Sequence, residues 1–360
     1  MRTIRLFVIL GFLVITQVAN AQVGGTFVRV GDMTMERSSP LATLLADGRV
    51  LILGGPPDLY DPSTRSFARS NVAPCSALAA TQLLDEQVLI ICPSGIASEL
   101  YDPATDTLRA TGAMIESQDV HSATLLPNGK VLIACGARAE LYDPATGIFS
   151  LTGKYVQDSP PFVSPRANLT GDGRVLLTGV GLPEIYDPAT GTWTLTAEAG
   201  SPAYRRLMSI VEWQAATSLM DGTVLISGGN DDETCGGFDS AEVFDPSTAT
   251  FSFAGSMSSN RDAHSATLLD DGTVLVAGGG VGWCYAPTKG SAEIYDPAKR
   301  SFVPVGKMTV PRSGHSATLL KDGTVLIAGG FSWYPYTTLR SAELYVPVAP
   351  AHAGRRPGRR

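Results

Sequence analysis

The chain has 360 residues and a formal net charge of −7, and only 17% of its residues are charged. This acidic balance argues against a nucleic-acid-binding protein, which needs a basic surface. The hydrophobic share of 44% is ample for the core of a compact β protein.

The N-terminal segment has the pattern of a secretory signal peptide. Two arginines precede an apolar run at positions 6–15, and residues 19–21 read Ala-Asn-Ala, as at a cleavage site. A membrane-spanning helix needs about 20 apolar residues, so this run is too short to cross a bilayer. We therefore expect residues 1–21 to be a signal peptide, and a secreted or periplasmic protein without a membrane span to begin at Gln22.

The following chain contains seven copies of one sequence unit. The clearest copy, HSATLLKDGTVLIAGG, begins at His315, and near copies begin at His264 and His121. Looser copies begin at Pro40, Leu78, Pro165 and Gln214. A second phrase with an acid, an aromatic residue and Asp-Pro follows each copy, as in AELYDPAT, and the last copy ends instead in AELYVP. Units of about 48 residues repeated in this way predict a repeat architecture.

Each unit predicts four β-strands. HSATLL and TVLIAGG are short apolar runs joined by Asp-Gly or Asn-Gly, which favours a type I′ hairpin turn. The second unit has Asp85-Glu86 instead, and we expect its hairpin to be weaker. AELY predicts the third strand, which ends at the Asp-Pro turn, and a run with a large apolar residue predicts the fourth. The glycine pairs are expected where backbones approach closely.

The two ends of the chain complement each other. Residues 25–33 match a fourth strand but follow no unit, whereas the last unit has no fourth strand after Pro347. Pairing them would close a ring and remove exposed sheet edges. We predict an all-β fold over 22–348, a seven-bladed β-propeller of four-stranded antiparallel blades whose last blade is closed by the N-terminal strand. Residues 349–360 predict a basic disordered tail, with contact to a polyanion or membrane surface as the alternative.

The glycine pair, the acidic-aromatic-Asp-Pro phrase and the aromatic fourth strand resemble the kelch repeat. The wording HSATLLxDGxVLIAGG is similar to the propeller domain of bacterial galactose oxidase-like proteins. This resemblance covers nearly all of residues 22–348 and implies a kelch-type propeller. It implies no single activity, because kelch propellers include enzymes and binding scaffolds.

Galactose oxidase-like enzymes hold copper with a tyrosine cross-linked to cysteine, a second tyrosine beside a histidine, and a further histidine. In that family the cysteine and both tyrosines directly precede the first strands of their blades. The matching positions here hold neither residue type: Ser39, Ala77, Val120, Ser164, Trp213, Ala263 and Gly314. Copper-radical chemistry is therefore not expected, and no catalytic residue, metal site or cofactor is predicted.

Other polar residues recur at equivalent positions and are predicted to be structural. An acid lies two residues before each third-strand aromatic: Asp58, Glu99, Glu140, Glu184, Glu242, Glu293 and Glu343. Their expected partners are the arginines three residues before a first strand, namely Arg37, Arg261 and Arg312. His121, His264 and His315 share the start of the first strand, where buried core histidines are favoured over a metal site.

Five cysteines in an exported chain predict disulfides. Cys235 and Cys284 occupy corresponding loops of adjacent blades, and antiparallel pairing would bring Cys75 close to Cys92. We expect both pairs to form bridges and Cys135 to remain a free, buried thiol.

The loops between second and third strands are longer in blades five to seven. These loops and the long segment before blade five supply the candidate ligand-binding residues: Trp283, Tyr285, Trp333, Tyr334, Tyr336, Asp231, Asp232, Glu233, Arg205 and Arg206. Aromatic rings beside carboxylates suit the stacking of a sugar ring or contact with a protein, and packing within the loops is the alternative. The acidic cluster lacks the ligand pattern of a calcium loop, so solvated charge is favoured there.

These features predict an exported, monomeric module that binds a glycan or a protein ligand through the loops of blades five to seven. The alternative is a carbohydrate-directed enzyme at the same face, similar to galactose oxidase or a sialate epimerase.

Overall fold

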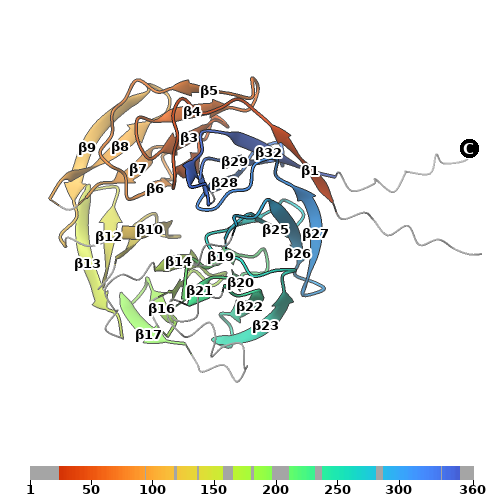
Figure 1. Cartoon of the computed structure of the whole chain (residues 1–360). Coiled ribbons are helices and arrows are strands. Elements are labelled where there is room, and N and C mark those ends of the chain that lie inside the picture. Colours follow the sequence, from red (N-terminus) through yellow and green to blue (C-terminus); the bar gives the residue numbers. More distant parts are fainter. Residues whose placement is uncertain are drawn as a thin grey trace, which may run out of the picture.

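The computed structural model describes residues 24–93, 95–116, 120–135, 138–156, 165–179, 182–196, 211–231, 237–280, 287–333 and 335–348. Seven four-stranded antiparallel sheets stand around a central axis (Figure 1). The predicted seven-bladed, all-β propeller is therefore confirmed. The expected signal peptide and basic tail lie outside the described residues. In the described part of the chain, no helix is long and apolar enough to span a membrane.

The first strand of each blade lies nearest the axis and the fourth lies at the rim (Figure 1). Blade one contains β2 (Leu41–Leu44), β3 (Val50–Leu53), β4 (Asp58–Asp61) and β5 (Ser66–Arg69). Blade two contains β6 (Ala79–Gln82), β7 (Val88–Ile91), β8 (Ala97–Asp102) and β9 (Thr107–Ala113). Blade three contains β10 (Val120–Leu125), β11 (Val131–Cys135), β12 (Arg138–Asp143) and β13 (Ile148–Lys154). Blade four contains β14 (Arg166–Leu169), β15 (Val175–Thr178), β16 (Glu184–Asp187) and β17 (Thr192–Leu195).

Of the last three blades, the fifth and the seventh carry additional short strands. Blade five contains β19 (Ala215–Ser218), β20 (Val224–Ser227), β22 (Ser240–Asp245) and β23 (Thr250–Ser256), with the pair β18 (Val211–Glu212) and β21 (Asn230–Asp231). Blade six contains β24 (Ser265–Leu268), β25 (Val274–Ala277), β26 (Ser291–Asp296) and β27 (Ser301–Lys307). Blade seven contains β28 (Ser316–Leu319), β29 (Val325–Ala328), β32 (Ala342–Pro347) and β1 (Gly25–Arg29), with the pair β30 (Phe331–Ser332) and β31 (Thr337–Thr338).

The N-terminal strand β1 closes the ring as the outer strand of blade seven. It pairs antiparallel with β32, placing Phe27 opposite Tyr345 and Val28 opposite Leu344. The rings of Phe27 and Tyr345 lie 5.2 Å apart. Cross-strand aromatic pairs of this kind stabilise antiparallel strands, so the closing strand is held by side chains as well as by its backbone.

The second strand of each blade forms the core between blades. All four residues of β25 are fully buried. Val274 and Val276 pack toward blade five, whereas Leu275 and Ala277 pack toward blade seven. Alternate side chains of a strand point to opposite faces, so an uninterrupted apolar run fits a strand that is covered on both sides.

The hairpin between first and second strands is not the predicted type I′ turn. In blade six the Gly272 N–H donates to Leu269 O at 3.0 Å, and Asp271 Oδ1 accepts the N–H of Thr273 at 2.9 Å. Gly272 has a φ of 84°, and Asp271 is not among the residues with positive φ. A type I′ turn needs positive φ at both central residues, so the observed loop is a three-residue turn with glycine in the left-handed region. Asp-Gly suits both turns, which is why the prediction was wrong.

Blade two forms the same hairpin without the glycine. Glu86 takes its place with a φ of 69°, and its N–H donates to Leu83 O at 3.1 Å. A residue with a Cβ is disfavoured in this region by about 1–2 kcal/mol. The expected cause of a weaker hairpin in blade two is therefore the backbone conformation of Glu86.

The repeated acids fasten each connecting segment, the stretch between the fourth strand of one blade and the first strand of the next. In blade seven Glu343 accepts the N–H of Thr309 at 2.7 Å. The fully buried Arg312 donates to Glu343 at 3.0 Å and to the carbonyls of Gly329 and Ser341 at 2.9 and 2.8 Å. We call this arrangement the arginine clamp, because it joins the connecting segment to the second and third strands.

The ion pair of the clamp recurs in blades six and one, as Arg261–Glu293 at 2.8 Å and Arg37–Asp58 at 2.7 Å. The structural role predicted for these pairs is confirmed. The glycine pairs pack against the connecting segment of the next blade. A Cβ on Gly278 would lie 2.5 Å from the backbone oxygen of Arg312. Close backbone approach therefore requires glycine at this position.

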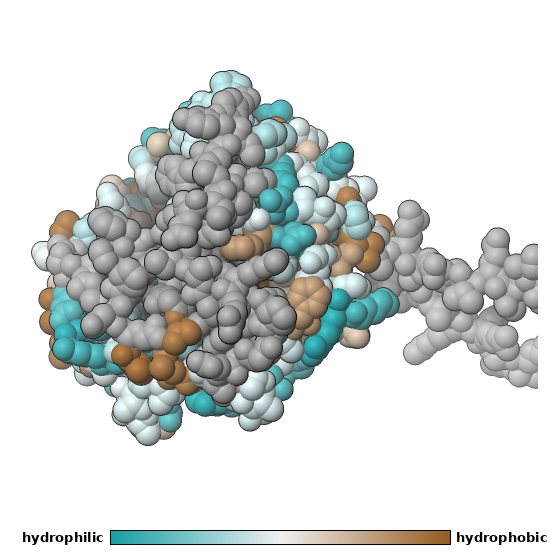
Figure 2. All heavy atoms as spheres, turned by 60° about the horizontal axis from the view of Figure 1, so that its bottom comes forward, coloured by the Kyte–Doolittle hydropathy of each residue, from teal (hydrophilic) through white to brown (hydrophobic). Residues whose placement is uncertain are grey.

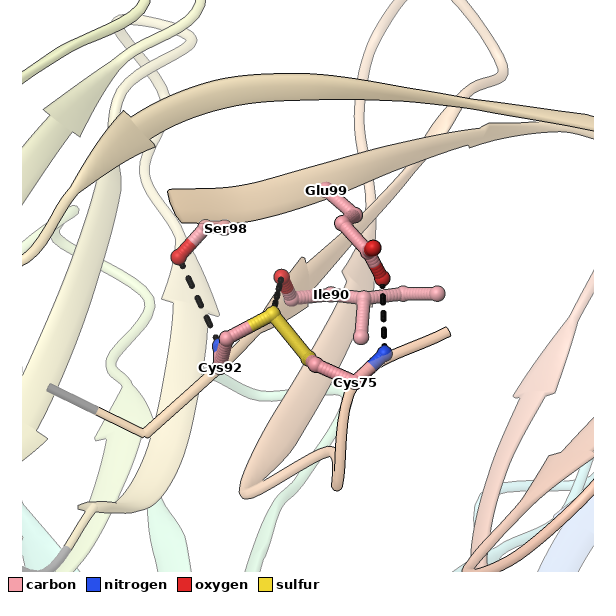
Figure 3. Close-up of a disulfide and its surroundings, with 5 residues drawn as sticks. All are labelled: Cys75, Ile90, Cys92, Ser98 and Glu99. Carbon is pink, nitrogen blue, oxygen red and sulfur yellow. Dashed lines mark hydrogen bonds between the residues drawn. A yellow bond between two sulfur atoms is a disulfide. The ribbon is translucent and has the colours of Figure 1, made fainter. Parts of the chain in front are cut away.

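In blade two a disulfide replaces the arginine clamp (Figure 3). Cys75 holds the position that Arg37 holds in blade one, three residues before the repeat unit, and Cys92 follows β7 as Gly54 follows β3. The two cysteines are joined, as the sequence predicts. Glu99 accepts the N–H of Cys75 at 2.9 Å, so this acid too fastens the connecting segment of its blade.

The remaining cysteines divide into two groups. Cys135 is a free thiol buried at the end of β11, and burial raises its pKa to about 12. Cys235 and Cys284, the other predicted pair, lie outside the described residues.

Candidate functional site

In blades five to seven the chain that follows the second strand and its glycine pair meets the connecting segment of its own blade. Asn230 pairs with Glu212 through β21 and β18. Isolated bridges join Gly280 to Asp262 in blade six and Phe331 to Ser313 in blade seven. The residues directly after the three glycine pairs, Asn230, Gly280 and Phe331, are thereby held against the segments that begin the first strands.

A backbone chain links these segments from blade to blade. The N–H of Ala263 donates to Trp213 O at 2.9 Å, and the N–H of Gly314 donates to Ala263 O at 2.9 Å. All three residues have positive φ, with values of 61° for Trp213, 44° for Ala263 and 62° for Gly314. Positive φ is uncommon for a bulky residue such as tryptophan, and such strain often accompanies a functional site.

A cavity of about 360 Å³ opens at this end of the propeller. Its lining comes from Ser38 and Ser39 before blade one, Trp213 and Asn230 in blade five, Asp262 and Ala263 in blade six, and Ser313, Phe331, Trp333 and Tyr336 in blade seven. Sites for small ligands range from about 300 to 1,000 Å³, so this cavity suits a compact ligand.

Three aromatic rings form one wall of the cavity. The centroid of Phe331 lies 5.2 Å from that of Trp333 and 5.7 Å from that of Tyr336, and Trp333 and Tyr336 lie 5.4 Å apart. The N–H of Trp333 donates to Thr288 Oγ1 at 2.7 Å, which ties the loop to blade six. Tyr336 is 59% exposed, so its ring is accessible to a ligand.

Exposed apolar side chains elsewhere are dispersed. Leu151, Leu195 and Phe253 lie on the outer strands of three different blades. Figure 2 shows the apolar side chains as separate brown patches between polar ones on the side that it brings forward. The aromatic wall differs from these patches because its rings contact one another and line a hollow.

The polar side of the cavity is built around Asp262 and Asn230, both of which are buried. Asn230 Nδ2 donates to Asp262 Oδ2 at 3.0 Å, and the N–H of Gly280 donates to Asp262 Oδ1 at 3.1 Å. Among the described residues, Asn230 Oδ1 and Trp213 Nε1 are two buried atoms for which no hydrogen-bond partner is found. The cavity therefore combines an aromatic wall with the polar residues Asn230 and Asp262.

The structure brings together part of the predicted site. Trp333 and Tyr336 line the cavity. The backbone of Asp231 lies in β21, and its side chain is outside the description. The other candidates are outside the described residues: Trp283, Tyr285, Tyr334, Asp232, Glu233, Arg205 and Arg206.

The prediction missed the polar residues of the cavity. Asn230 follows a glycine pair, where blades six and seven have glycine and phenylalanine. Trp213 precedes a first strand, where blades six and seven have alanine and glycine. Comparing these positions between copies of the repeat could have identified both residues, because each departs from its equivalents.

The described residues do not fit a copper-radical centre. At the positions of the family's cysteine and tyrosine ligands, the cavity presents Ser39, Trp213 and Ala263. His264 and His315 are turned away, since their Nε2 atoms lie 2.9 Å from the hydroxyls of serines in the preceding blades. Among the described side chains, the one His/Cys/Asp/Glu group spaced for a metal contains the sulfurs of the Cys75–Cys92 disulfide.

Comparison with known proteins agrees with the fold. Residues 214–258 match the Kelch motif family. A fungal alcohol oxidase of the AA5 family, solved in complex with copper, superimposes with a TM-score of 0.72 at 17% sequence identity. The match covers 90% of this chain and 76% of the oxidase chain. No curated protein matches the sequence. At this identity the similarity establishes a shared propeller fold alone.

Proposed function

We propose that this kelch-type propeller is a carbohydrate-binding module, and that its ligand occupies the cavity between blades five, six and seven. The observation that carries the proposal is the wall of Phe331, Trp333 and Tyr336, which shares the cavity with the polar side chains of Asn230 and Asp262. A pyranose ring has an apolar face for stacking and hydroxyl groups at its edge. The two sides of the cavity offer matching chemistry.

A sugar is favoured over a protein partner by the shape of the site. Protein interfaces are broad, at about 800 Å² per partner, and their energy is concentrated in a central cluster of anchors. The aromatic and polar groups here converge on a hollow of about 360 Å³. A hollow of this size accommodates a mono- or disaccharide unit more readily than a folded surface.

The proposal is tested by a glycan array followed by calorimetric titration of the best ligand. Trp333→Ala and Tyr336→Ala should each weaken binding about tenfold or more, because each removes an aromatic ring from the wall. Phe253→Ala is the matched control, since Phe253 is an exposed ring on the outer strand β23. Its affinity should equal that of the unmodified chain.

Two results would overturn the proposal: an array on which no glycan is retained, or retention that both cavity variants leave unchanged. The ligand should also be recovered unaltered, without release of hydrogen peroxide. Turnover of the bound sugar would instead favour a carbohydrate-directed enzyme at the same face.

We also propose that the module acts outside the cytoplasm as a monomer. The pattern of residues 1–21 supports export, and a disulfide in blade two is compatible with an oxidising compartment. Mass spectrometry of the protein from the periplasm or the medium should find Gln22 at its N-terminus, and light scattering should give the mass of one chain. A retained leader in the cytoplasmic fraction would refute export.

A further inference from the structure

A second hollow, of about 490 Å³, is lined by two lysines, Lys289 and Lys307, and we call it the lysine hollow. Ser259, Ser291 and Thr309 add hydroxyl groups to its lining. None of the described residues that line it is acidic. Neither ammonium group forms a hydrogen bond or an ion pair with the described part of the chain. The lining therefore carries two positive charges and no negative charge of its own.

Lys289 replaces an apolar residue at a scaffold position. The equivalent residues are Phe238 in blade five and Leu339 in blade seven. All three hold the same place in the backbone, since each N–H donates to the carbonyl of the second glycine of the preceding pair at 2.8–2.9 Å. The fold fills this place with an apolar side chain in the two neighbouring blades, so the scaffold does not require a lysine here.

The charge of Lys307 has no partner of the kind that blade seven supplies. The equivalent residues are Ser256 in blade five and Asp32 in blade seven. Asp32 forms an ion pair with Arg340 at 3.3 Å, and blade six has Gly290 in place of that arginine. The carbonyls of Arg340 and Gly290 both accept the N–H of the methionine that ends the fourth strand, which confirms that the two positions correspond. Blade seven thus neutralises its own charge, whereas blade six combines two cations.

The strand register places Lys307 beside a hydroxyl group. Lys307 lies directly opposite Ser291 in the pairing of β26 with β27 (Figure 1). Directly opposed residues project on the same face of a sheet, with Cβ atoms about 4.5–5.5 Å apart. Ser291 Oγ accepts a hydrogen bond from Arg261 at 2.9 Å, so its own hydrogen remains for another acceptor.

The surroundings of Lys289 favour an anion. Burial lowers the pKa of this lysine, and the charge of Arg261 lowers it further, against smaller opposing effects of Asp262 and Glu293. An anion within contact distance stabilises the charged form of a lysine, so binding would reverse this destabilisation.

The lysine hollow and the aromatic cavity share their supporting segments. The N–H of Trp333, on the cavity wall, donates to Thr288 Oγ1, and Lys289 is the next residue. Ser313 lines the cavity, and Pro311, two residues earlier, lines the hollow. Two residues of extended chain span at most about 7 Å, so one oligosaccharide can reach both places.

We propose that the lysine hollow binds an anionic group, a carboxylate or a sulfate ester, of the glycan whose ring stacks in the aromatic cavity. Lys289 and Lys307 donate from their ammonium groups to the anionic oxygens, and the hydroxyl groups of the lining donate beside them. The whole chain has a net charge of −7, so a local cluster of cations is needed to select an acidic ligand. This inference rests on the proposed carbohydrate binding and names its ligand class as an acidic oligosaccharide.

The test is calorimetric titration with three forms of one oligosaccharide: a form that contains a uronic acid, the form in which the carboxyl group is reduced to an alcohol, and a sulfated form of the reduced sugar. At low ionic strength the unmodified chain should bind the acidic forms about 5- to 30-fold more tightly than the neutral form. This preference should decrease as salt is added, because exposed charges are screened. Comparing the carboxylate with the sulfate identifies which oxyanion the hollow prefers.

The variants come from the protein's own repeats, which keeps them compatible with the fold. Lys289→Leu introduces the residue of blade seven, and Lys307→Ser introduces the residue of blade five. The double variant should bind all three forms with the affinity that the unmodified chain has for the neutral form. Lys154→Ser is the matched control, because Lys154 ends the fourth strand of blade three as Lys307 ends that of blade six. It removes the same charge elsewhere and should keep the preference.

The outcomes separate this inference from the proposed function. If none of the three forms and no other glycan binds the unmodified chain, the carbohydrate proposal fails and this inference fails with it. If acidic and neutral forms bind equally, or the double variant keeps the preference, recognition of an anion by the lysine hollow is refuted while carbohydrate binding stands. An equal loss of preference in Lys154→Ser would attribute it to net charge and would also refute the site.

Discussion

Blade two provides a test of what holds a propeller blade to its connecting segment. Its Cys75–Cys92 bridge spans 17 positions in sequence and takes the place of the arginine clamp of blades one, six and seven. In the chain-entropy account, a loop of this size gives a disulfide a contribution of about 3 kcal/mol to the free energy of unfolding. Replacing both cysteines by serine should therefore lower Tm by roughly 4–6 °C in a chain of this length.

The clamp itself should restore part of that loss. In Cys75→Arg/Cys92→Gly, the guanidinium meets Glu99, the acid that stands where Glu293 and Glu343 hold their arginines. We expect this variant to recover about half of the lost stability, because a buried arginine with a carboxylate and carbonyl partners replaces the covalent link. Its Tm should not respond to a reductant, whereas the Tm of the unmodified chain should fall.

The assay is urea and thermal unfolding followed by circular dichroism, with and without reductant. Cys75→Leu/Cys92→Gly is the matched control, since it fills the same space without a charge. If the arginine variant is no more stable than the leucine variant, the equivalence of disulfide and clamp is wrong. If the double serine variant unfolds at the same urea concentration as the unmodified chain, the bridge contributes nothing measurable.

Two further predictions concern local conformation and pH. Glu86→Gly should raise the free energy of unfolding by about 1 kcal/mol, because Glu86 has a φ of 69° that glycine adopts without strain. Gly272→Glu in blade six should lower the free energy of unfolding by a similar amount. Urea midpoints that are the same in the two variants would contradict strain at this position of the turn. His264 and His315 have their pKa lowered from 6.5 to about 3, first by burial and then by a nearby arginine. The unfolded chain binds these protons near pH 6.5, so the stability is fully present above that pH and is lost as pH falls toward 3, by about 1.4 kcal/mol per unit for each histidine. Urea midpoints between pH 6.5 and 4.5 should show a shallower slope in His315→Gln, and an unchanged slope would exclude this histidine as the cause.

The fold could be predicted because the repeat gives the same information many times. Each copy indicates the same four strands, and the unpaired strand at residues 25–33 matches the gap after Pro347, which defines the closure that β1 and β32 form. The clamp could be predicted for the same reason, since a recurring acid and a recurring arginine indicate a scaffold. The turn type could not, because Asp-Gly is compatible both with a two-residue type I′ loop and with a three-residue loop whose glycine is in the left-handed region.

The cavity was predicted less well because its residues are brought together by the ring and not by the repeat. Asn230 and Trp213 are 17 positions apart, and the pairing of β21 with β18 brings their segments together. Long loops with aromatic residues are visible in the sequence, and they indicate Trp333 and Tyr336. Buried polar side chains beside the repeat give no such signal, since a single asparagine or tryptophan in one copy is compatible with ordinary packing.

The scaffold also explains why the residues that differ between blades lie beside the repeat unit and not within it. A Cβ on Gly278 would lie 2.8 Å from the ring of His315, so the end of the second strand cannot vary without moving the next blade. The residues just before the first strands are also joined from blade to blade by backbone hydrogen bonds. There blades five, six and seven carry Trp213, Ala263 and Gly314, and the last has no room for a side chain, because a Cβ would lie 2.8 Å from Phe331. The equivalent positions thus change from one large residue to two small ones, and the first two of them, Trp213 and Ala263, line the cavity.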